Sequence, residues 1–176
     1  MKTKTEKILT VLKVLAWMAM ISYVVQAGSQ LISFGVTFIN PMSANGTYGT
    51  SLNLQDLYHH SLLYFFQAIS FTLALAVMHA VVWYSVIQVL SSLNLKNPFS
   101  KNVAKILENI SIQLLGIWVV TVIGEQSIRW IGKNSGLDIG TLPAEHEYLF
   151  FAGIIYVISQ VFKRGIELQE ENELTV

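Results

Sequence analysis

Residues 8–38 read ILTVLKVLAWMAMISYVVQAGSQLISFGVTF, with Lys13 as the one charged side chain among them. An α-helix rises about 1.5 Å per residue, so about 20 mostly apolar residues are needed to cross a hydrocarbon core of about 30 Å. This stretch therefore predicts a membrane-spanning helix that is tilted or protrudes from the bilayer. A cleaved signal peptide is the less favoured interpretation, because the apolar stretch is too long and lacks a clear small-x-small cleavage site.

Three further apolar stretches follow, at residues 58–90, 103–131 and 147–165. The whole chain of 176 residues is 53% hydrophobic and only 12% charged, whereas a soluble domain is usually about a quarter charged. We therefore predict an all-α polytopic membrane protein with four transmembrane helices in an antiparallel bundle. The chain forms one domain in this prediction, with a short acidic tail at residues 166–176.

Lysine and arginine residues in the short flanks predict the orientation, because positive residues are retained on the cytoplasmic side. One side of the predicted topology holds nine of the 11 basic residues: Lys2, Lys4, Lys7, Lys13, Lys96, Lys101, Lys105, Lys163 and Arg164. Only Arg129 and Lys133 fall on the other side. Both termini are therefore expected in the cytoplasm, and residues 39–57 and 132–146 are expected to be outer loops without a folded domain.

Several function classes are disfavoured by composition. The chain has no cysteine, which excludes thiol nucleophiles, zinc-thiolate sites and iron-sulfur clusters. Its formal net charge is zero, so direct nucleic acid binding is not expected. No nucleophile-base pair, phosphate-binding loop or metal motif is legible. We expect a protein that is not an enzyme and needs no cofactor.

The segment before the third span contains Asn97, Pro98, Phe99 and Ser100. Asn97 could cap a helix whose first position is Pro98, since proline lacks the N–H donor that a first turn leaves unused. Ser100 is a competing cap. The segment is interpreted either as a topology anchor with basic side chains that snorkel or as a docking site for a partner.

The last ten residues are acidic and amphipathic. Their glutamates are Glu167, Glu170, Glu171 and Glu173, and the apolar residues in and beside them are Ile166, Leu168, Leu174 and Val176. Anionic lipid repels such a segment, which favours a protein surface as its partner. A basic DNA-binding domain would be complementary in charge, and the terminal residues could add a strand to another protein or enter a groove on it. The alternative is a solvated tail.

These two segments, NPF at residues 97–99 and LQEENELTV at residues 168–176, resemble the bacterial four-pass inner-membrane family catalogued as domain of unknown function 2975. The resemblance spans nearly the whole chain. It implies no established activity, but members of the family are typically found beside a small helix-turn-helix regulator. We therefore expect a non-enzymatic regulator that binds or sequesters such a cytoplasmic partner. The expected partner-binding residues are Asn97, Pro98, Phe99, Glu167, Leu168, Glu170, Glu171, Leu174 and Val176.

His79, Glu125 and Arg129 lie away from the cytoplasmic ends of the predicted spans. An ionisable side chain at membrane depth is costly, so each of them is a candidate for a functional role. Glu125 and Arg129 share a helical face, which favours an ion pair over a buried ligand contact. His79 has no second central histidine with which to bind haem or metal, so a neutral hydrogen-bonding role between helices is favoured. Its candidate partners are Tyr23, Gln26 and Gln113.

His59, His60 and His146 lie at the predicted outer edge near several carboxylates. This chemistry suits zinc or another first-row metal. Adjacent histidines on a helix point about 100° apart, however, so the residues fit an interfacial belt better. The second functional hypothesis is a membrane sensor or carrier of a small hydrophobic or metal ligand, using these histidines with His79, Glu125 and Arg129.

A homo-oligomer is a further possibility that the first span raises. Small residues along it could face a second copy of the chain or pack inside one bundle: Ala19, Ser22, Gly28 and Ser29.

Overall fold

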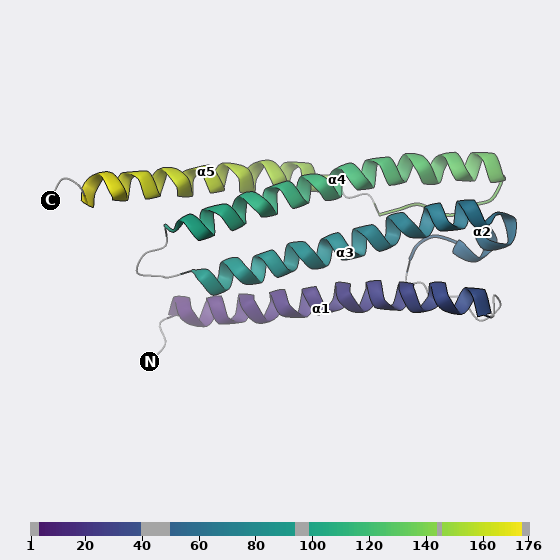
Figure 1. Cartoon of the computed structure of the whole chain (residues 1–176), viewed down its shortest axis with the longest axis horizontal. Helices are drawn as coiled ribbons and strands as arrows, with labels where there is room; N and C mark the ends of the chain where they lie inside the picture. Colours follow the sequence, from purple (N-terminus) through teal and green to yellow (C-terminus); the bar gives the residue numbers. More distant parts are fainter. Residues whose placement is uncertain (1–3, 40–49, 94–98, 144–145, 174–176) are drawn as a thin grey trace. The chain divides into compact units, whose positions relative to one another are not determined.

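The computed structural model describes residues 4–39, 50–93, 99–143 and 146–173. Within these ranges the chain is all-α and contains no β-strand. Four helices are long and apolar enough to cross a membrane, which confirms the predicted fold class. They are α1 (Lys4–Ile39), α3 (Leu62–Ser92), α4 (Lys101–Ser135) and α5 (Glu147–Glu173), and a short helix, α2 (Leu54–His60), precedes α3 (Figure 1).

The second span does not begin at residue 58, as predicted, but at Leu62. Ser61 lies between α2 and α3 with an extended backbone (φ −160°, ψ 121°). Its N–H donates to the carbonyl of Leu57 and closes α2, while its own carbonyl accepts from the N–H of Phe65 and opens α3. One residue therefore ends one helix and starts the next, and the turn contains no glycine or proline that would mark it in the sequence.

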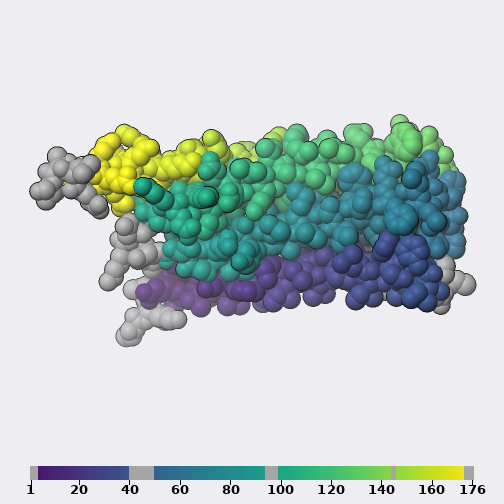
Figure 2. Space-filling view, viewed as in Figure 1, coloured from purple at the N-terminus to yellow at the C-terminus, as the bar shows by residue number. Residues whose placement is uncertain are grey.

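The chain forms two compact units. The first comprises residues 1–20, 81–116 and 147–176, and the second comprises residues 21–80 and 117–146. Helices α1, α3 and α4 each contribute one segment to either unit. Large apolar side chains are exposed along all four long helices, whose surfaces Figure 2 shows in sequence colours. Such exposure is expected where lipid replaces water as the surroundings.

In the first unit, α4 and α5 run antiparallel. Lys101 at the start of α4 meets Glu170 near the end of α5, and Glu108 meets Lys163 further along both helices. Segments of α3 and α4 are joined by the hydroxyl of Ser85, which donates to the side-chain carbonyl of Gln113 at 3.1 Å. The buried apolar side chains of the first unit include Ala16, Val103, Ala104 and Ile110.

The second unit has an apolar core that includes residues predicted to be plain outer loops. Leu54 and Leu57 of α2 are buried with Phe65 of α3 and with Ile128 and Ile131 of α4. Leu52, Ile139 and Leu142 from the connecting segments complete this core. These segments were predicted to be loops without a folded domain, and the structure shows that part of one is the helix α2 and that both contribute to this core. The leucines and the isoleucine of these segments are single apolar residues among turn residues, so they showed no helical or strand pattern. Together they nevertheless bury a continuous apolar surface.

The two connecting segments of this unit are held together by backbone contacts. The N–H of Asn53 donates to the carbonyl of Ile139 at 3.1 Å, and the hydroxyl of Ser51 donates to the carbonyl of Thr141 at 2.5 Å. Gly140 lies at this contact with φ +75°, and a Cβ atom there would overlap the carbonyl oxygen of Ser51. Only glycine allows both the left-handed backbone and the close approach.

We expect Gly140→Ala to lower the thermal stability of the purified protein more than Gly136→Ala does. Both glycines have positive φ, but a Cβ atom at Gly136 meets nothing within 4 Å. The control substitution should cost about 1 kcal/mol of backbone strain, and Gly140→Ala should cost at least about 1 kcal/mol more. Thermal unfolding in detergent measures both. Equal losses would show that the contact with Ser51 is not tight.

Candidate functional site

The start of α4 is capped by Ser100. Its hydroxyl accepts a hydrogen bond from the N–H of Val103 at 3.2 Å, and its carbonyl accepts the first helical bond from Ala104 at 3.0 Å. Of the two candidate caps, Ser100 is therefore the one that caps this helix. Asn97 and Pro98 themselves lie outside the described residues.

Phe99 packs directly against α5. Its ring lies 5.3 Å from that of Phe162, at an interplanar angle of 62°. A Cβ atom on Gly165 would come within 2.7 Å of the Phe99 ring, so the missing side chain of residue 165 is what lets the ring approach. We call this contact, together with the adjacent pair Lys101 and Glu170, the α4–α5 junction.

The junction is surrounded by ion pairs. Lys101 Nζ lies 2.7 Å from a carboxylate oxygen of Glu170, with the two side chains 78% and 56% exposed. Lys163 Nζ lies 3.0 Å from Glu108, and both of these side chains are partly exposed. Exposed pairs of this kind contribute about 0–1 kcal/mol each. The pairs therefore align the two helices, while the packing of Phe99 on Gly165 brings them close.

The predicted acidic tail is the end of α5, because this helix continues to Glu173. Glu167, Leu168, Glu170 and Glu171 are exposed on its last turns. Arg164 donates to Glu167 at 2.7 Å, one turn back on the same helix. Leu174 and Val176 lie outside the described residues. The four described candidates therefore share one short helical segment with an exposed, acidic surface.

His79 lies in the second unit and is buried. Its Nδ1 is 2.7 Å from the carbonyl of Leu75; a carbonyl only accepts, so this nitrogen carries the hydrogen. The ring of Tyr23 stacks on the imidazole, with ring centroids 4.7 Å apart and an interplanar angle of 10°, so Tyr23 contacts His79 through its ring. Gln26 and His79 both line a small cavity within the second unit. Gln113 belongs to the first unit.

Glu125 and Arg129 form the predicted ion pair. Arg129 donates to one carboxylate oxygen of Glu125 at 2.8 Å. The other oxygen lies 3.6 Å from Nε2 of His146, so the structure brings an outer histidine to this pair. Arg129 and His146 thus flank a carboxylate that is mostly buried.

The three outer histidines do not gather at one point. His59 lies against Tyr58, with ring centroids 5.7 Å apart, and His60 stacks on Tyr64 at 6.2 Å. His146 lies beside Glu125 instead. In the part of the chain that the structure describes, no three His, Cys, Asp or Glu residues are placed to hold a metal ion. His59 and His60 take the aromatic contacts of an interfacial belt.

A family model described as protein of unknown function (DUF2975) matches residues 53–176. The chain belongs to this family. The DUF2975 match covers α2 to α5 and includes both sides of the α4–α5 junction. No curated protein and no solved structure matches the chain.

Three residues of these sites were missed by sequence reasoning. Gly165 and Lys101 complete the junction, and Gln30 lines the cavity beside His79. The one signal for the junction was a glycine among charged residues late in α5, where helix propensity disfavours glycine. Gln30 gave no signal, because a single amide in an apolar span is as well explained by a contact with another helix.

In the DUF2975 protein we expect Gly165→Leu to separate the end of α5 from the start of α4. The added side chain would occupy the space of the Phe99 ring. Because the chain has no cysteine, a double variant Lys101→Cys, Glu170→Cys reports this contact through crosslinking by a short bismaleimide. Gly165→Leu should lower the yield several-fold.

The matched control is Gly153→Leu on the same helix, where a Cβ atom meets nothing within 4 Å. It should leave the crosslinking yield unchanged. A yield that is insensitive to Gly165→Leu would contradict the packing at the junction.

Proposed function

We propose that this DUF2975 protein is a non-enzymatic membrane regulator that binds or sequesters a basic cytoplasmic protein through the end of α5. The observation that carries the proposal is the course of α5. The helix continues as far as Glu173, and its last described turns expose acidic side chains beside an apolar one.

Charge and shape both favour a protein partner. Glu167, Glu170 and Glu171 repel anionic lipid, while Leu168, 45% exposed, offers an apolar anchor. A helix with this pattern suits a groove that has an apolar floor and a basic rim. A small helix-turn-helix transcription factor has a basic DNA-binding surface, and the family resemblance makes it the first partner to test.

Binding need not dismantle the junction. Glu170 pairs with Lys101, and Glu167 pairs with Arg164, but exposed ion pairs are weak and exchangeable. A basic partner would replace these contacts at little cost, while Phe99 stays packed on Gly165. The junction thus supports the end of α5 as a presented helix.

Orientation is part of the proposal. Nine of the 11 lysines and arginines fall on one side of the four-span topology, which favours the cytoplasm for that side and for both termini. In a bacterial inner membrane this arrangement gives a soluble regulator access to the end of α5.

We expect deletion of residues 167–176 to leave membrane insertion intact and to abolish co-purification of the helix-turn-helix product of a neighbouring gene. The triple variant Glu167→Gln, Glu170→Gln, Glu171→Gln should weaken binding about tenfold or more, since three charges are removed from the interface. Binding should also fall as salt rises. Co-purification from membranes with immunoblotting measures these effects.

The matched control is Glu147→Gln, at the other end of the same helix, which should leave co-purification unchanged. Retention of the partner by the deletion variant would contradict the proposal.

Single-cysteine variants test the orientation. We expect Asn134→Cys, at the end of α4, to react with a membrane-impermeant maleimide on intact cells. Asn172→Cys, near the end of α5, should react only after lysis, because it lies on the cytoplasmic side. Both residues are exposed, and the unsubstituted chain has no cysteine to give background. The reverse labelling pattern would overturn the orientation.

A further inference from the structure

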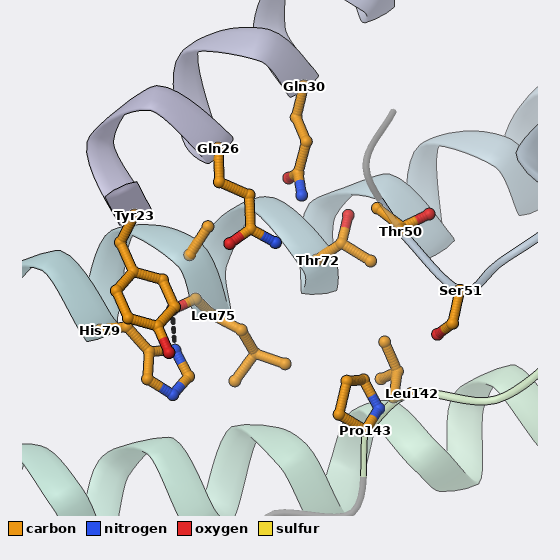
Figure 3. Close-up of a pocket in the computed structure, with 11 residues that line it drawn as sticks. Tyr23, Gln26, Gln30, Thr50, Ser51, Thr72, Leu75, His79, Leu142 and Pro143 are labelled. Atoms are coloured by element: carbon orange, nitrogen blue, oxygen red, sulfur yellow. Dashed lines mark hydrogen bonds between the residues drawn. The ribbon is translucent and has the colours of Figure 1, made fainter. Parts of the chain in front are cut away.

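A cavity of about 150 Å³ lies within the second unit, between α1, α3 and the connecting segments (Figure 3). Its polar walls come mainly from Tyr23, Gln26 and Gln30 of α1 and from Thr72 and His79 of α3. None of the residues that line it is Asp, Glu, Lys or Arg. The cavity is therefore rich in hydrogen-bonding groups but carries no permanent charge.

Gln30 is the side chain that distinguishes this cavity from ordinary helix packing. It is 1% exposed, and Figure 3 shows its side chain extending from α1 into the cavity. Neither its Nε2 nor its Oε1 has a hydrogen-bond partner among the residues that the structure describes. A buried polar group almost always has a partner, since leaving it unpaired is destabilising. A bound molecule would supply the missing partner.

We propose that this cavity binds a small uncharged molecule with a carboxamide head and a flat apolar body. A carboxamide both donates and accepts, so it would pair with Nε2 and Oε1 of Gln30 at once. The aromatic rings of Tyr23 and His79 line the cavity beside the body, and Leu75 and Leu142 provide apolar contacts.

Size and charge narrow the ligand class. A cavity of about 150 Å³ is large enough to hold benzene, which sets the scale of the ligand as a singly substituted ring. An ion would lose its hydration without gaining a counter-charge, because the lining has no acidic or basic residue other than His79. A neutral amide is therefore favoured over the corresponding carboxylate.

Benzamide is the probe that tests the site, with the purified full-length protein in detergent and calorimetry or ligand-observed NMR as the measurement. We expect saturable binding of benzamide and much weaker binding of benzoate, which has the same shape and a charge. Gln30→Leu should weaken benzamide binding about tenfold or more, since two hydrogen bonds are lost. Toluene, which cannot form them, should bind equally well to both proteins.

Ser33→Ala is the matched control. Ser33 is also buried on α1 and has no partner for its hydroxyl in the described residues, but it does not line the cavity. Its substitution should leave benzamide affinity unchanged. A second variant, Ala76→Leu, fills the cavity without altering Gln30 and should also abolish binding.

Thermal unfolding separates loss of the site from loss of the fold. Gln30→Leu removes an unpaired buried amide, so its melting temperature without ligand should not fall. Benzamide should raise the melting temperature of the unsubstituted protein and not that of Gln30→Leu. If benzamide does not bind saturably, or binds the unsubstituted protein and Gln30→Leu with equal affinity, the proposal is overturned and water is the occupant of the cavity. Neither result bears on the partner proposed for the end of α5.

Discussion

Hydrocarbon offers no hydrogen-bond partner to a peptide group, so a chain inside a bilayer must satisfy its backbone internally. Four long helices do this in the DUF2975 protein, and their exposed apolar side chains follow from the same surroundings. Where the chain leaves these helices, its backbone N–H and C=O groups still need partners, and they find them in other ways. At Ser61 one residue closes α2 and opens α3, and at Asn53 and Ile139 two connecting segments pair with each other.

The same constraint explains which parts of the fold are predictable from sequence. A spanning helix corresponds to a long run of apolar residues, so all four long helices were predicted, although α5 continues past the predicted end at residue 165 to Glu173. The apolar core of the second unit was not predicted, because Leu54, Leu57 and Ile139 are buried by contacts between segments that are distant in sequence. The break at Ser61 was missed because serine, unlike proline, is compatible with a continuous helix.

The residues of the candidate sites also divide into those that sequence predicts and those that it does not. The pair of Glu125 and Arg129 was predicted because both residues lie on one helix at a fixed spacing. The contact between Phe99 and Gly165 joins two helices, and neither residue alone indicates the other. Tyr23 was named as a hydrogen-bonding candidate for His79, but the contact that the structure shows between them is ring stacking. Gln30 was not predicted, because its lack of a hydrogen-bond partner among the described residues becomes visible only in the folded structure.

Exposed and buried polar groups therefore affect the stability of this protein differently. The carboxylates at the end of α5 are hydrated, and their pairs with Lys101 and Arg164 are weak enough to be exchanged for contacts with a partner. The amide of Gln30 has neither water-exposed surface nor a partner among the described residues. A surface charge without a partner costs little, whereas a buried amide without one lowers stability. An occupant of the cavity would therefore stabilise the fold, whereas the acidic end of α5 is stable in water with or without a binding protein.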